Sequence, residues 1–394
     1  MSATPLRLQQ AVATLAFAVL TLAPNSTAPA DPPRPPHLPP ALEKQAQAAI
    51  DRGLEYLKAA QDREGGWTPK YGPAITAIVG QAFAQHPDYG PRHPLVRRCV
   101  DIVLRHRRED GGLYTPGLHL ANYQTAVALS FVASVDDSKL APVIRDAQRF
   151  LRELQFDERE SVPPDDPWYG GAGYTEKKPR DQMKRPDLSN TQMMLEALHA
   201  SGMPSTDPAF QRGLKFITRC QMLAATNDQP FAAGSTDGGF IYSAADGGQS
   251  KAGEIVREGP RRALRSYGSM TYAGFKSMLY AGLDRDDPRV RAAHAWLGRH
   301  YTLDANANMP EKQSQEGLYY YYHVFARALH AWGEPTLTDA QGRVHLWRVD
   351  LCRKLISLQR SDGSWINEAD RWNEGDPNYV TALAVLSMQT ALRP

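Results

Sequence analysis

Hydrophobic and polar residues alternate with the period of an α-helix along nearly the whole of this 394-residue chain. Two kinds of helical segment follow one another. One is amphipathic with a charged stripe, as in EKQAQAAIDRGLEYLKAAQ at 43–61, and the other is apolar nearly all round, as in TALAVLSMQTAL at 381–392. Few stretches alternate with period two, so we predict an all-α fold with almost no sheet.

Six glycine-containing turns interrupt the helical pattern. An amphipathic segment precedes each turn and a more apolar segment follows it, which predicts six helix pairs. The turns are Gly65–Trp67, Asp110–Leu113, Gly170–Tyr174, Asp237–Phe240, Glu316–Tyr319 and Asp362–Trp365. A column near the start of the apolar segments gives the same count. It is formed by Thr76, Thr125, Thr191, Thr271 and Thr381, with Tyr322 in the fifth pair.

One helix pair cannot bury its apolar face alone, so neighbouring pairs must stack. The apolar segments suit an inner ring and the charged ones an outer ring in water. Six pairs can form an open solenoid or a closed ring. Because no polar capping repeat is evident, we predict a single closed α6/α6 toroid over residues 41–394. The Gly- and Pro-rich stretches around 156–186 and 222–265 are expected to fold over one mouth of the ring.

The N-terminus has the pattern of a secretory signal peptide. Arg7 precedes an apolar run at 11–23, and Ala28–Ala30 resembles a cleavage site. We therefore predict a signal peptide at 1–30, a proline-rich linker at 31–40, and an exported protein, periplasmic or secreted. An uncleaved membrane anchor is the alternative, so a membrane surface stays open as a partner.

Charge and cysteine content exclude some classes. There are 45 Lys and Arg against 43 Asp and Glu, with no basic run, so nucleic acid is not an expected partner. Cys99, Cys220 and Cys352 lie in helical segments and are interpreted as buried small hydrophobic residues. The oligomeric state stays open.

The first and last turns carry a motif of glutamine, glycine and tryptophan. It contains Gln61 and Trp67 in the first copy and Gln359 and Trp365 in the last. On these residues, 42–392 resembles the terpenoid cyclase and protein prenyltransferase superfamily. The resemblance implies an α/α toroid whose helix ends these four side chains brace, and an isoprenoid-like ligand in a central cavity.

The resemblance also points to an acid site, at 187–191. Where squalene-hopene cyclases have D-x-D-D-T, this chain has Asp187, then Ser189 and Asn190 in place of two acids. A serine hydroxyl cannot protonate an alkene near neutral pH. Asp187 is therefore either a buried general acid or, more simply, a helix N-cap. Proton-initiated cyclisation is not expected.

A zinc site like that of the prenyltransferases is not expected either. Asp350 and Cys352 have the spacing of the family's metal pair, but no histidine follows Cys352 in the chain. We predict no metal and no cofactor.

Polar aromatic and amide residues cluster near the starts of the apolar segments. The candidate ligand-binding residues are Tyr123, Gln124, Ser189, Asn190, Tyr267, Tyr320, Asn378 and Tyr379. His323 is a second candidate catalytic residue. Such groups on a concave surface suit stacking on a sugar, or binding an apolar ligand with polar ends. The simpler interpretation is that helix starts are often polar and that tyrosines pack well.

Three functions remain open at this stage. They are an isoprenoid-binding or isoprenoid-processing ring, a carbohydrate-active toroid (a polysaccharide lyase or hydrolase using Asp187 or Glu196), and a catalytically silent binding or scaffold ring. A cavity lined by Phe, Met and Leu would favour lipid, and one lined by Tyr, Asn, Arg and Trp would favour glycan. Cations expected near the mouth are Lys184, Arg185, Arg257, Arg261, Arg262 and Arg265. They suit an acidic sugar or a phosphate, or are solvated loop charges.

Overall fold

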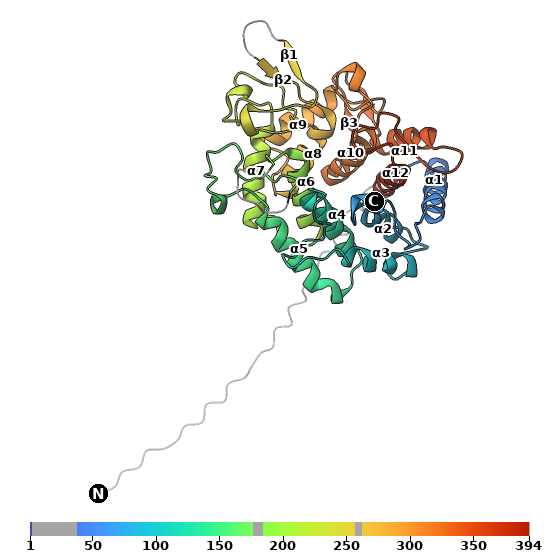
Figure 1. Ribbon diagram of the computed structural model, residues 1–394. Helices are drawn as coiled ribbons and strands as arrows, with labels where there is room; N and C mark the ends of the chain where they lie inside the picture. The colour runs from blue at the N-terminus through green and yellow to red at the C-terminus, as the bar shows by residue number, and fades with distance from the viewer. Residues whose placement is uncertain (2–37, 176–183, 257–261, 394) are drawn as a thin grey trace. The chain divides into compact units, whose positions relative to one another are not determined.

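The computed structural model describes residues 1, 38–175, 184–256 and 262–393. The predicted signal peptide and most of the linker lie outside these residues. Within 38–393, twelve α-helices and two short hairpins form the unit that begins at His37 (Figure 1). Leu38 is already part of the core, and the first helix begins at Pro40. None of the described helices is long and apolar enough to cross a membrane.

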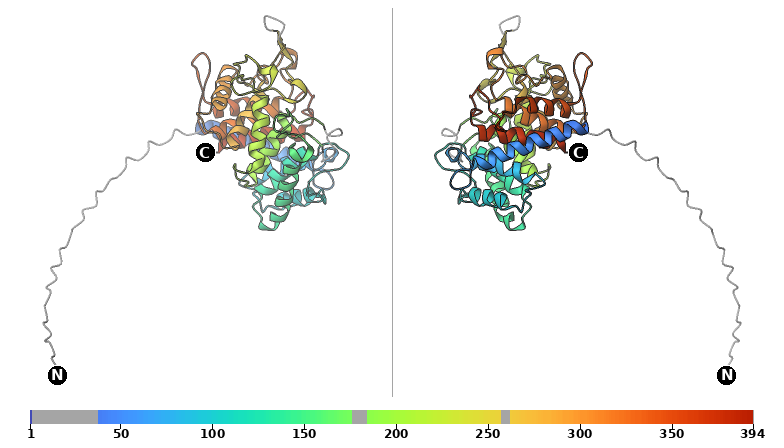
Figure 2. Two further views of the ribbon diagram at one scale, coloured as in Figure 1. Left: turned by 90° about the vertical axis from the view of Figure 1, so that its left-hand side faces the viewer. Right: turned by 90° about the vertical axis from the view of Figure 1, so that its right-hand side faces the viewer.

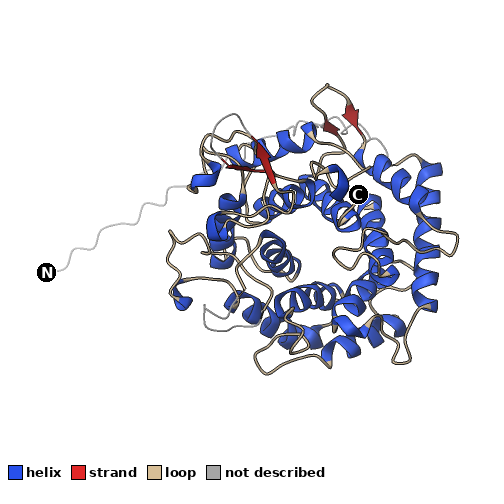
Figure 3. Ribbon diagram, turned by 45° about the horizontal axis from the view of Figure 1, so that its top comes forward, coloured by secondary structure: helices blue, strands red, loops and turns tan. Residues whose placement is uncertain are grey.

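Six helices form the inner ring, and they are the apolar segments of the sequence pattern. They are α2 (Ala74–Ala84), α4 (Ala121–Ser134), α6 (Leu188–Ala200), α8 (Gly268–Tyr280), α10 (Leu318–Trp332) and α12 (Pro377–Leu392). Each contacts the next one, and α12 contacts α2, so the ring is closed (Figure 3). The predicted all-α toroid is confirmed.

The outer ring consists of the amphipathic helices. They are α1 (Pro40–Ala59), α3 (Pro94–Leu104), α5 (Ala141–Glu153), α7 (Pro208–Cys220), α9 (Pro288–Arg299) and α11 (Trp347–Leu358). The first and last, α1 and α11, lie beside each other and against α12 (Figure 2). Two antiparallel hairpins lie in loops, β1 (Glu254–Val256) with β2 (Arg262–Leu264), and β3 (Leu337–Thr338) with β4 (Val344–His345).

Proline and aspartate start several outer helices. Pro208 and Pro288 occupy the first helical position, where a missing N–H costs nothing. The preceding Asp207 and Asp287 each accept a hydrogen bond of 2.9 Å from the backbone N–H two residues on. Asp287 is thus the N-cap of α9.

The threonine column fastens the glycine turns to the inner helices. Thr191 Oγ1 accepts the backbone N–H of Ala172 at 3.0 Å, and Thr381 Oγ1 accepts that of Trp365 at 3.0 Å. Thr76, Thr125 and Thr271 receive the equivalent bonds from Trp67, Leu113 and Phe240. A buried backbone N–H without a hydrogen-bond partner is costly. Each of these repeats therefore needs a short side chain with a hydroxyl group at this position.

The fifth pair differs from the sequence prediction. No turn of this kind is formed at Glu316–Tyr319, because Gly317, with φ of 67°, is the N-cap of α10. The loop that follows α9 takes the place of the turn. The Tyr322 hydroxyl donates to the Leu303 carbonyl of that loop at 2.7 Å. In this pair the longer side chain of tyrosine reaches from the inner helix to the loop, as threonine does in the other pairs.

Glutamine and tryptophan side chains brace the helix ends where the resemblance places them. Gln359 Nε2 donates to the Gly363 carbonyl and to the Ala49 carbonyl of α1, both at 2.9 Å, and so joins the last pair to the first. Gln61 Nε2 donates to the carbonyl of Gly65 at 3.0 Å. Trp67 and Trp365, both buried, donate their indole N–H to carbonyls of α1 and α11.

The backbone conformation at the first glycine of the glycine-containing turns requires glycine. Gly170 and Gly363 have φ of 81° and 89°. A Cβ would lie 1.8 Å from the Arg212 carbonyl oxygen at the first and 2.5 Å from the Arg52 oxygen at the second. Both the left-handed conformation and the close approach to the neighbouring outer helix exclude larger residues.

Candidate functional site

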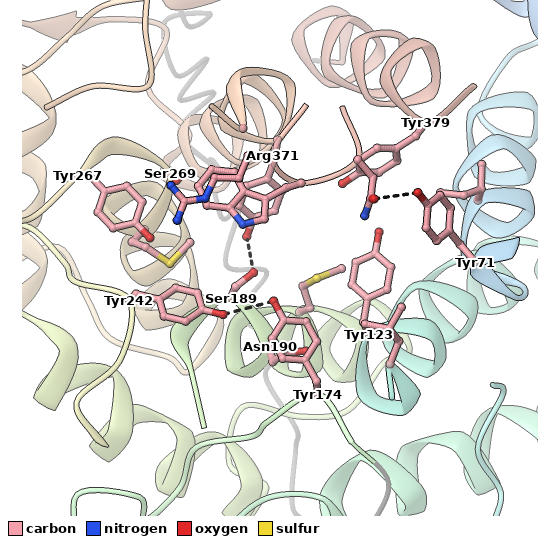
Figure 4. A pocket seen from close by; sticks show the side chains of 18 residues that line it. Tyr71, Tyr123, Tyr174, Ser189, Asn190, Tyr242, Tyr267, Ser269, Arg371 and Tyr379 are labelled. Carbon is pink, nitrogen blue, oxygen red and sulfur yellow. Dashed lines mark hydrogen bonds between the residues drawn. The ribbon is translucent and has the colours of Figure 1, made fainter. Parts of the chain in front are cut away.

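A cavity of about 200 Å³ lies at the mouth where the inner helices begin. All six helix pairs contribute to its wall, which carries seven tyrosines (Figure 4). We call it the upper cavity. It is lined by Tyr71, Ile75, Leu120, Tyr123, Tyr174, Ser189, Asn190, Met193, Tyr242, Tyr267, Ser269, Met270, Gly317, Tyr320, Arg371, Trp372, Asn373 and Tyr379.

Six of the eight predicted ligand-binding residues line the upper cavity, namely Tyr123, Ser189, Asn190, Tyr267, Tyr320 and Tyr379. Gln124 and Asn378 do not. Gln124 accepts the backbone N–H of Thr115 and donates to the carbonyl of Tyr71, and Asn378 donates to the Thr68 hydroxyl. These two amides hold loops beside the cavity.

Asp187 is a helix cap behind the cavity wall. One carboxylate oxygen accepts the backbone N–H of Asn190 at 2.8 Å and the other accepts the Asn190 side chain at 2.9 Å. Asp187 is 2 % exposed and does not line the cavity. Burial raises the pKa of this carboxyl group to about 6, against the hydrogen bonds from Asn190 and Tyr242.

Tyrosine hydroxyl groups bond to one another and to polar neighbours around the cavity. The hydroxyls of Tyr174 and Tyr242 lie 3.3 Å apart, and that of Tyr320 lies 3.4 Å from Ser189 Oγ (Figure 4). Burial raises the pKa of Tyr123 and of Tyr174 to about 12, so both stay neutral and act as donors and acceptors.

Loops cover this mouth, as the sequence predicts for two of them. The loop from α5 to α6 supplies Tyr174, and the loop from α7 to α8 supplies Tyr242 and Tyr267. The predicted cations whose side chains are described do not line the cavity. Arg185 bonds to Gln249, and Arg265 is half-buried outside the lining. Lys184 does not line the cavity either. Arg257 and Arg261 lie outside the described residues, and so does the side chain of Arg262.

The loop from α11 to α12 was not predicted to contribute to the site. This loop places Arg371, Trp372 and Asn373 in the wall. Arg371 is paired with Glu316 at 2.6 Å and lies over the Trp372 ring. A Cβ on Gly317 would come within 2.8 Å of the Trp372 ring, so glycine allows the indole to lie across the start of α10. No signal in the sequence singled out this loop, because five of the seven tryptophans lie outside the glycine turns.

Glu374 anchors this loop from below. Its carboxylate accepts the backbone N–H of Tyr320 at 2.8 Å and the side chain of Asn367 at 2.6 Å. Glu374 is fully buried, and burial raises the pKa of its carboxyl group to about 7 against these hydrogen bonds. It stabilises the N-terminus of α10, where a partial positive charge favours an acid.

A second cavity of about 60 Å³ lies further along the ring axis. It shares Tyr123, Met193, Tyr320 and Tyr379 with the upper cavity, so one layer of side chains separates the two. We call it the lower cavity. His323 lines it together with Glu196 and Arg327. The second candidate catalytic residue is therefore not in the same chamber as most of the tyrosines.

No group of three or more His, Cys, Asp and Glu side chains in the described ranges is arranged to hold a metal ion. Cys352 is buried, and Asp350 accepts the hydroxyl of Tyr301 at 2.9 Å. All three cysteines are free and buried, as the sequence predicts.

Comparison with known proteins finds similarity at the level of the fold. No family model and no curated protein matches the sequence. A type II terpene cyclase variant, MstE from Scytonema in complex with geranylgeranyl dihydroxybenzoate, is similar with a TM-score of 0.55 and 17% identity, over 90% of this chain and 98% of the cyclase. A glycosidase variant has a TM-score of 0.51 and 12% identity, over 91% of this chain and all of the other. A possible GH105 family member from Salmonella enterica has a TM-score of 0.52 and 12% identity, over 89% and 94% of the two chains. These similarities establish the toroid and leave the reaction open.

Proposed function

We propose that this protein binds a compact saccharide, of about one or two sugar rings, in the upper cavity. The observation that carries the proposal is the composition of the wall. Seven tyrosines and Trp372 are joined by Asn190, Asn373 and Arg371, and no phenylalanine is among the lining residues. A sugar offers apolar faces that stack on aromatic rings and hydroxyl groups that bond to tyrosine and amide groups.

Size supports a small ligand. The cavity volume of about 200 Å³ is below the range of about 300–1,000 Å³ that is usual for drug-sized ligands. The similarity to a glycosidase and to a possible GH105 member is consistent with a saccharide. Catalysis is not part of this proposal, because neither Asp187 nor Glu374 lines the cavity.

A second candidate ligand is an isoprenoid with a polar end. Ile75, Leu120, Met193 and Met270 form an apolar part of the wall, and the lower cavity continues it with valine and leucine side chains. The similar terpene cyclase holds a geranylgeranyl compound. Binding, without cyclisation, is the form of this candidate that the buried position of Asp187 supports.

Export remains a proposal from the N-terminal sequence. We infer cleavage before Asp31 by signal peptidase. Intact-mass measurement of protein isolated from its native cells would show a chain that begins at Asp31. A chain that retains residues 1–30 would contradict cleavage and support a membrane anchor.

Binding is tested with residues 31–394 on a glycan array, followed by calorimetry on the best saccharide and on geranylgeraniol. We expect micromolar binding of a saccharide and a loss of about tenfold in Trp372→Ala, since about 1.4 kcal/mol corresponds to a factor of ten. Trp168→Ala is the matched control, because Trp168 packs on Phe156 away from the cavity. Binding of geranylgeraniol alone, weakened in Trp372→Ala, would replace the saccharide with the second candidate.

A further inference from the structure

The lower cavity lies in the body of the ring, beyond the tyrosine layer. Glu196 follows Ser189 by seven residues on α6, which is roughly 10 Å along the helix axis. Glu196 and Arg327 are 12 % and 16 % exposed, so solvent reaches the chamber. Nothing in the saccharide proposal uses these groups.

The ionic groups at the lower cavity are unbalanced. Glu196 is paired with both Lys276 and Arg327, and Lys276 is fully buried. One carboxylate therefore faces two cations. Among the described residues, positive charge exceeds negative charge in this cluster.

His323 adds an uncharged donor to the wall. Burial and the neighbouring Arg327 lower the pKa of His323 to about 3, so the imidazole is neutral. Its Nδ1 atom is buried and has no hydrogen-bond partner. His323 lines the lower cavity, and a neutral imidazole can donate one hydrogen bond.

An unbalanced buried charge is costly, and a counter-ion lowers that cost. The volume of about 60 Å³ equals the liquid volume of about two water molecules, which is also enough for one small oxyanion. Arginine is well suited to such a ligand, because its guanidinium group offers several donors in a plane.

We propose that the lower cavity binds one small oxyanion, of the phosphate or carboxylate class, through Arg327 and the neutral imidazole of His323. Lys276 supplies the second positive charge from behind Glu196. The site is separate from the saccharide site, with the tyrosine layer between them.

The test uses inorganic phosphate as the probe, with thermal unfolding followed at constant ionic strength set by chloride. Wild type should gain melting temperature as phosphate rises, because a ligand that binds the native state stabilises it. The variants change the cluster in opposite directions. Lys276→Met leaves Glu196 and Arg327 balanced and should lose the phosphate response, whereas Glu196→Gln adds an unbalanced charge and should enlarge it at least severalfold.

The double variant Glu196→Gln, Lys276→Met serves as the control. It restores an excess of one positive charge and should respond as wild type does. If Glu196→Gln does not fold, Lys276→Met and the double variant still carry the test. Equal phosphate responses in all the folded proteins would show a general salt effect and overturn the proposal. Crystals soaked in bromide give a second readout, an anomalous peak in the lower cavity of wild type that Lys276→Met lacks.

Discussion

The upper and lower cavities are built on the same six inner helices but differ in the origin of their polarity. Hydroxyl, amide and indole groups from loops and helix starts surround the upper cavity, and the Arg371 guanidinium in its wall is paired with Glu316. The buried carboxyl groups near it, Asp187 and Glu374, serve as helix caps. The lower cavity has full charges on the middle and later turns of the helices. The parallel inner helices place partial positive charge at the upper mouth and partial negative charge at the far end, and the cations lie toward that end. Helix direction thus separates the aromatic, hydrogen-bonding wall of the upper cavity from the excess positive charge of the lower cavity.

The largest expected effect comes from breaking the charged cluster of the lower cavity. Glu196→Gln leaves Lys276, which is 0 % exposed, and Arg327 without a carboxylate. Removing one partner of a buried ion pair costs about 3–5 kcal/mol. Urea unfolding in chloride should show a loss of stability of that order.

A matched surface pair gives the control for this measurement. Glu55 and Lys58 lie 3.4 Å apart with more than half of each side chain exposed. Glu55→Gln should change stability by less than about 1 kcal/mol. A Glu196→Gln effect equally small would mean that solvent screens the cluster.

The next effect concerns Glu374, whose carboxyl group has a raised pKa. Because the pKa of about 7 in the folded chain exceeds the ordinary value of 4.5, the folded state holds an extra proton between these pH values. The free energy of unfolding of wild type should therefore fall, relative to Glu374→Gln, as the pH rises from about 4.5 to about 7. The relative change is on the order of 3 kcal/mol.

Comparison with Glu374→Gln removes the opposite contribution of the histidines. His323 has a lowered pKa, so its contribution to stability rises with pH between about 3 and 6.5 in both proteins. Urea unfolding at pH 5 and pH 7.5 measures the difference. Parallel pH profiles would show that the folded chain keeps Glu374 ionised through its hydrogen bonds to α10.

The repeat pattern predicts the two rings because the spacing of hydrophobic residues within each helix indicates how much of that helix is buried. The threonine column was predicted as a marker of the repeat count and the glutamines as helix braces, and both recur along the chain because each makes a local bond. Most of the upper-cavity tyrosines were also predicted, because ring closure brings all the inner helix starts to one mouth. To predict these tyrosines it is enough to know that all the inner helices run in the same direction.

Residues outside the repeat register could not be predicted in this way. Arg371 and Trp372 lie in an irregular loop, whose path depends on Gly317 and on the buried Glu374. The charged cluster combines Glu196, Lys276 and Arg327 from three helices. No spacing in the sequence links them, because the contact depends on the relative rotation of neighbouring helices.

The smallest expected effect separates a cap from an acid at Asp187. Asp187→Ala should cost about 0.5–2 kcal/mol, because the Asn190 backbone N–H loses its acceptor, and Asp187→Asn should cost only a few tenths of a kcal/mol, because asparagine also caps helices. Asp187→Asn should not change saccharide affinity, since Tyr174, Tyr242 and Asn190 form the wall in front of Asp187 and the asparagine amide oxygen can still accept the Asn190 side chain. The measurement pairs urea unfolding with calorimetry on the same preparations.

If Asp187→Asn kept its stability but lost binding or a turnover found in wild type, the carboxyl group would have to act through Tyr242. Asp187 would then belong to the chemistry of the upper cavity, and the contrast with the charged lower cavity would no longer hold.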